Sequence, residues 1–118
     1  FVTSSGWVRS NQTVKPDAFI PYPYPDLSVT RHKDLSESEI WRIGQAIANA
    51  RPAKLRGRAD VTAMQVRQRK LEVEARPIPE NPKHASITGW PPDKPSQKSF
   101  AQELAAVARF VPNRAALR

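Results

Sequence analysis

The chain contains no cysteine among its 118 residues. Disulfides and thiolate zinc sites are therefore excluded, and the absence of thiols is compatible with the cytoplasm, where we expect the protein to reside. No stretch of about 18 apolar residues occurs, so we expect no membrane span. The first residues lack a basic segment followed by an apolar one, and we expect no signal peptide.

Other chemical signatures are also missing. The four glycines form no glycine-rich phosphate loop, and the sequence has neither a nucleophile elbow nor a paired-carboxylate motif. Only two histidines are present, and without cysteine they form no metal-ligand pattern. We therefore predict no metal site and no cofactor.

Positive charge is what the chain has in excess. Its formal net charge is +8 and its isoelectric point is near 10.5. The segment 51–76 alone holds eight lysines and arginines against three acidic residues, a net charge of +5. A basic surface attracts polyanions, which include nucleic acid, anionic lipid and an acidic protein face. The alternative is a solvated surface that only keeps the protein soluble.

Twelve prolines divide the chain into segments. Ten of them lie in 16–25, 77–82 and 91–95, and we interpret these stretches as connections, because proline interrupts helix interiors and central strands. Between the connections, alternating apolar and polar residues predict strands. The predicted strands are 27–31, 55–61, 71–75 and 85–88.

Capping signals and apolar stripes predict three helices. Ser36 and Glu39 have the spacing of a capping box, as do Thr62 and Gln65, and Ser96 is the expected cap of the last helix. The predicted helices are 37–50, 63–69 and 97–110. The resulting architecture is a single α+β domain over residues 1–118, with a mixed sheet of three to five strands and two main helices packed on one face.

His84 and Asp60 are the candidate catalytic residues. A neutral imidazole near pH 7 can act as an acid or a base, although a solvated or hydrogen-bonded histidine is the alternative. Asp60 shares one face of its predicted strand with Arg58. It could orient Arg58 or His84 beside an anionic substrate, or it could form an ordinary surface ion pair with Arg58.

Four cations are candidate anion-binding residues. Arg56 and Arg58 project from one strand face. Lys94 and Lys98 lie around the start of the last helix, where free N–H groups attract anions and disfavour cations, unless they are simply exposed loop lysines. Trp90 could stack on a base or could pack in its turn.

Residues 83–91 read Lys-His-Ala-Ser-Ile-Thr-Gly-Trp-Pro. This segment resembles a family of small bacterial proteins of unassigned function, whose pattern is His-Ala-x-Ile-x-Gly-Trp-Pro followed by lysines and an alanine-rich helix. The resemblance continues in 15–19, 27–31 and 57–60 and covers most of the chain. Similar sequences have arginine and asparagine where this chain has Lys83 and Ser86. The resemblance implies no activity.

Three functions follow from these features. The leading hypothesis is a small basic binding or accessory domain that engages a polyanion, with nucleic acid as the expected one. The second is a small enzyme that acts on a phosphate- or carboxylate-bearing substrate, with His84 as general acid or base. The third is a protein-interaction module, for example a homodimer, that docks through Pro21–Pro25 or an apolar patch.

Overall fold

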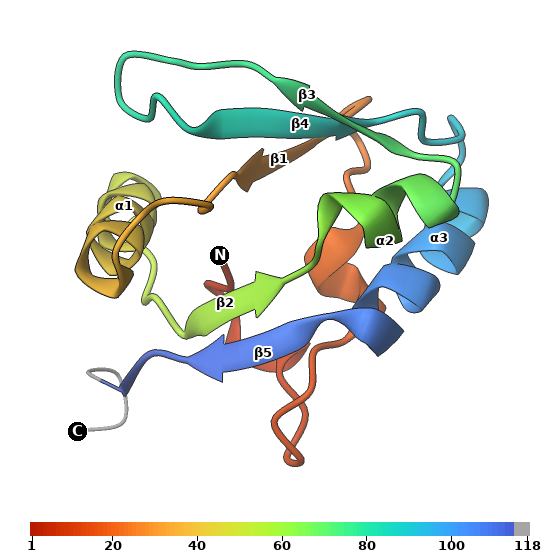
Figure 1. Ribbon diagram of the computed structural model, residues 1–118. Helices are drawn as coiled ribbons and strands as arrows, with labels where there is room; N and C mark the ends of the chain where they lie inside the picture. The colour runs from red at the N-terminus through yellow and green to blue at the C-terminus, as the bar shows by residue number, and fades with distance from the viewer. Residues whose placement is uncertain (115–118) are drawn as a thin grey trace.

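The computed structural model describes residues 1–114 and shows three α-helices and five strands in that range (Figure 1). None of these helices is long and apolar enough to cross a membrane. Two short 3-10 helices, η1 and η2, precede the first strand. In chain order the elements are η1 Ser5–Trp7, η2 Pro16–Phe19, β1 Leu27–Thr30, α1 Glu37–Ala50, β2 Gly57–Asp60, α2 Ala63–Gln68, β3 Glu72–Ala75, β4 His84–Thr88, α3 Lys94–Val107 and β5 Arg109–Pro112.

The α+β class is confirmed, but the strands form two sheets. One sheet has the order β1-β4-β3 and the other pairs β2 with β5, and every pairing is antiparallel. The sequence predicted one mixed sheet. In Figure 1 the three-stranded sheet lies at the top and the β2–β5 ribbon below it, with α1 at the left and α3 at the right. The two main helices lie at opposite ends of the molecule in this view (Figure 1), both below the three-stranded sheet.

The first two α-helices begin where their capping signals predicted. Ser36 Oγ accepts a hydrogen bond from the Glu39 N–H at 3.2 Å, and the Glu39 carboxylate accepts one from the Ser36 N–H at 3.1 Å. Thr62 and Gln65 form the same reciprocal pair before α2. Each box satisfies backbone donors that the first helical turn leaves open. Gly89 ends β4 as predicted, with a φ of 93° that glycine adopts without strain.

The last helix differs from its prediction at both ends. Asp93, not Ser96, is its N-cap, and the Asp93 carboxylate accepts a hydrogen bond from the Ser96 N–H at 2.9 Å. Proline at position 95 fits the first turn because its missing N–H would have had no partner there. The helix ends at Val107 with Ala108 as its C-cap, and 109–110, which were predicted to complete it, instead begin β5, which pairs with β2.

The core lies between the two sheets and the helices α2 and α3. Its largest fully buried side chains come from the N-terminal segment, α2, β4 and α3: Val2, Val14, Val66, Ile87 and Leu104. Partly buried residues of β1, β2 and β3 pack against this cluster. The two sheets therefore share one core. The candidate site is lined by residues of β1 and β3 from one sheet and of β2 from the other.

Candidate functional site

The strand β2 places Arg58 at the centre of a polar network. Only 8 % of its surface is exposed. Its Nη1 and Nη2 donate to the two carboxylate oxygens of Glu37 at 2.8 and 3.0 Å, and its Nε donates to Asp60 at 3.1 and 3.2 Å. Paired donors on a planar guanidinium match a carboxylate, so this geometry fixes the orientation of Arg58. Its charge is matched within the fold.

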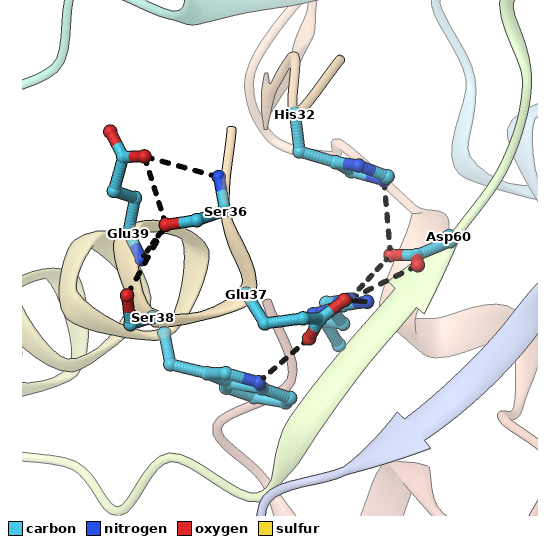
Figure 2. Close-up of polar contacts among 8 residues, drawn as sticks. His32, Ser36, Glu37, Ser38, Glu39 and Asp60 are labelled. Atoms are coloured by element: carbon cyan, nitrogen blue, oxygen red, sulfur yellow. Dashed lines mark hydrogen bonds and ion pairs between the residues drawn. The ribbon is translucent and has the colours of Figure 1, made fainter. Parts of the chain in front are cut away.

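The N-terminal turn of α1 supplies the partner of Arg58. The Ser36 cap places Glu37 at the first helical residue, facing β2 (Figure 2). Trp41, one turn later, donates its indole N–H to Glu37 at 3.2 Å, and the centre of its ring lies 5.0 Å from the Arg58 guanidinium carbon. A cation over an indole face is attracted to the π electrons. The hydrogen bonds from Arg58 lower the pKa of Glu37, and the pKa of Arg58 is raised in return.

His32 joins the network through Asp60. Its Nε2 lies 3.6 Å from Asp60 Oδ1, a distance typical of an ion pair and longer than a good hydrogen bond. Figure 2 shows the His32 ring directed at the Asp60 carboxylate. The side chain of His32 is 40 % exposed and that of Asp60 is 20 % exposed. The sequence left open whether Asp60 would orient Arg58 or His84 or form an ordinary surface ion pair with Arg58, and the structure brings it to Arg58 and His32.

His32, Arg58 and Asp60 line a cleft of about 760 Å³ that we call the His32 cleft. Its walls come from β1, β2, α2 and β3, and its cationic residues outnumber its acidic ones by five to two. Two of the five cations are engaged: Arg58 as described, and Arg67 with Glu72 at 2.8 Å. The other three are Arg31, Lys33 and Lys83, which we call the rim cations.

The pairing of β1 with β4 brings together two of the rim cations, Arg31 and Lys83. The ladder ends at Thr30 opposite His84, and one residue further the Arg31 N–H donates to the Lys83 carbonyl at 2.9 Å. Arg31 and Lys83 are therefore cross-strand neighbours of like charge. Within residues 1–114 no ion pair involves any rim cation.

His84 lies beside a second cleft of about 810 Å³, which also includes Tyr22, Tyr24 and Arg76. The Nδ1 atom of His84 lies 2.8 Å from the Arg76 carbonyl oxygen. A carbonyl only accepts, so Nδ1 carries the proton and Nε2 is free to accept from a ligand when the ring is neutral. Arg76 itself pairs with Asp26 and Glu74. The His84 imidazole is thus held in a defined tautomer.

The remaining predicted residues are spread over the molecule. Lys94 and Lys98 are exposed on the first turns of α3, and Arg56 is half-buried just before β2. None of the three lines either cleft. Trp90 is half-buried, donates its indole N–H to the Ile87 carbonyl at 2.9 Å, and packs edge-on against Phe100 at 6.4 Å. Its contacts are those of a packed turn.

Sequence reasoning missed the rim cations and His32. A local signal existed, because the predicted strand 27–31 ends on Arg31 and is followed directly by His32 and Lys33, and Lys83 directly precedes β4. Within residues 1–114 no group of three or more histidine, aspartate or glutamate side chains is arranged to hold a metal ion.

Comparison of the chain with protein-family models, curated proteins and solved structures finds no match. The resemblance carried by residues 83–91 therefore stays a prediction. Any functional conclusion depends on the geometry of the clefts.

Proposed function

We propose that this domain binds a polyanion, nucleic acid in particular, through the rim cations of the His32 cleft. The observation that carries the proposal is the cross-strand placement of Arg31 and Lys83. Like charges directly opposite on antiparallel strands destabilise a sheet. A phosphate held between them would offset that cost, because each cation then gains an opposite charge.

Lys33 supports the same proposal from the loop that follows β1. It lines the cleft with Arg31 and Lys83 and, like them, is in no ion pair within residues 1–114. Arg58 is not a contact in this proposal, although the sequence suggested it. Three of its five N–H donors are engaged by Glu37 and Asp60, and only 10 % of its side chain is exposed, which leaves little room for a phosphate.

The test is the salt dependence of binding to a labelled oligonucleotide of mixed sequence. Neutralising phosphates releases counterions, so the logarithm of the affinity should fall linearly with the logarithm of salt, by about 0.7 per contact on a single strand and about 0.9 on a duplex. Replacing all three rim cations with glutamine should remove most of the affinity at low salt. A flat salt response, or no binding at low salt, would end the proposal.

The contact between His32 and Asp60 favours a second candidate function. In it the domain is an enzyme on a phosphate-bearing substrate, with His32 as the general acid or base and Asp60 orienting the imidazole. This proposal takes over the role that the sequence suggested for His84. Hydrolysis of a labelled oligonucleotide by the wild-type protein, lost in His32→Gln while binding persists, is the expected result. An equal rate in both proteins would refute it.

A further inference from the structure

The His32 cleft has apolar walls beneath its cationic rim. Val29 on β1, Ala59 on β2, Val61 after β2 and Val73 on β3 are all only partly buried, and all four line the cleft. Its floor is closed by Val66 and Ile87, which are each 1 % exposed. The cleft is therefore lined both by accessible apolar side chains from three strands and by the rim cations Arg31, Lys33 and Lys83.

A concave apolar surface with a few convergent charges is typical of a site for a small ligand or a ligand fragment. Such sites occupy about 300–1,000 Å³, and the His32 cleft of about 760 Å³ lies in that range. The apolar wall favours a flat or aliphatic group, and the rim favours an anion attached to it. A nucleotide has both parts, a base with two apolar faces and a phosphate.

We infer that the His32 cleft accepts one unpaired base while the rim cations hold its phosphate, so that the domain selects single-stranded over duplex nucleic acid. This inference depends on the proposed function and names the form of the polyanion. The imidazole of His32, at the mouth of the cleft, is the polar group placed to meet the edge of that base.

The preference for a single strand has a physical reason. Burial of a base face against apolar side chains is favourable because it removes apolar surface from water, as stacking does. A duplex keeps its bases paired and stacked, so it reaches the cleft only after a base flips out, which costs free energy. The rim cations can still bind the phosphates of a duplex, but the cleft then adds nothing to the affinity.

The experiment compares a short single-stranded oligonucleotide with the duplex of the same sequence at one salt concentration. We expect the single strand to bind about tenfold tighter or more, which corresponds to 1.4 kcal/mol. In two-dimensional NMR spectra of the amides, the single strand should shift Val29, Ala59, Val61 and Val73, whereas the duplex should shift only the rim. Adenosine monophosphate should compete better than inorganic phosphate.

Ala63 offers a variant that narrows the cleft without touching the rim. It is exposed at the first residue of α2 and lines the cleft. Ala63→Leu should weaken single-strand binding several-fold and leave duplex binding unchanged. Ala106→Leu is the matched control, because Ala106 is exposed on α3 and lines neither cleft.

The outcomes separate this inference from the proposed function. Equal affinities for single strand and duplex, both steeply salt-dependent, would overturn the inference and leave the proposed function standing. Absence of binding to either form would overturn both. An amphipathic anion other than a nucleotide that shifts the same four amides, with no response to adenosine monophosphate, would also overturn the inference.

Discussion

Arg58 and Arg31 line the same cleft, but the fold surrounds their charges in opposite ways. Arg58 is buried, pairs with two carboxylates and lies over an indole ring. Arg31 is exposed, and its cross-strand neighbour is Lys83. The first cation holds α1 against β2. The second has no carboxylate partner within residues 1–114, and in the proposed function it contacts the ligand. A count of cations along a chain does not distinguish these two roles.

The largest expected effect on stability comes from removing the matched cation. Arg58→Met should lower the free energy of unfolding by about 2–3 kcal/mol, because the partly buried Asp60 and the indole of Trp41 lose their partner. The loss stays below that of a fully buried pair, since the Glu37 side chain is 69 % exposed. Urea denaturation measures it.

Arg67→Met is the control for that prediction. Arg67 also pairs with a carboxylate, Glu72, but more than half of each side chain is exposed. Exposed ion pairs contribute little, so this substitution should change the midpoint of unfolding far less. Equal losses for the two variants would show that the network around Arg58 does not stabilise the fold.

Removing the cap of α1 tests how firmly Glu37 is positioned. Ser36→Ala should cost about 1 kcal/mol, the usual effect of losing an N-cap. Asp93→Ala removes the corresponding cap of α3, away from the network. If the cap positions Glu37, the losses from Ser36→Ala and Arg58→Met should not add, whereas those from Asp93→Ala and Arg58→Met should.

A smaller effect of opposite sign is expected at the rim. Arg31→Gln and Lys83→Gln should each raise the free energy of unfolding by roughly 0.2–0.5 kcal/mol, because each removes the same cross-strand repulsion. The double variant should gain little more than either single one. Lys54→Gln, in the exposed loop before β2, is the control and should leave stability unchanged. A lower free energy of unfolding in Arg31→Gln or Lys83→Gln would mean that these two cations do not repel each other.

The smallest effect concerns pH. Arg58 holds the pKa of Glu37 below its ordinary value of 4.5. A depressed folded-state pKa contributes stability above the unfolded value, and that stability disappears as the pH falls through the folded-state pKa. Between neutral pH and the region below 4.5, the wild-type protein should therefore lose more stability than Glu37→Gln. Parallel pH profiles for the two proteins would contradict the pairing.

Local features of this fold could be predicted from sequence, and long-range ones could not. The Ser36 and Thr62 boxes involve partners three residues apart, so their pattern is visible in the chain. The prediction carried the last helix to residue 110, because Leu104, Val107 and Ala108 keep a helical spacing of apolar residues, whereas 109–110 pair with β2. The start of α3 was also predicted wrongly, because Ser96 was the expected cap and Asp93, three residues earlier, is the one used.

The candidate site illustrates the same limit. The strand face that carries Arg58 and Asp60 was predicted, since side chains two residues apart share a face. The partners Glu37 and His32 were not, because they lie more than 20 residues away and meet β2 only in the folded chain. The pairing of β1 with β4, which brings Arg31 to Lys83, depends on a register that no local pattern specifies.

The most direct test is the salt dependence of single-strand binding by two variants that each lose positive charge. One carries glutamine at Arg31, Lys33 and Lys83, and the other carries glutamine at Lys94 and Lys98. The account predicts that the log–log slope becomes shallower by about 2 in the rim variant, at 0.7 per phosphate contact, and stays at the wild-type value in the α3 variant. Equal slopes in all three proteins, or a change confined to the α3 variant, would contradict it.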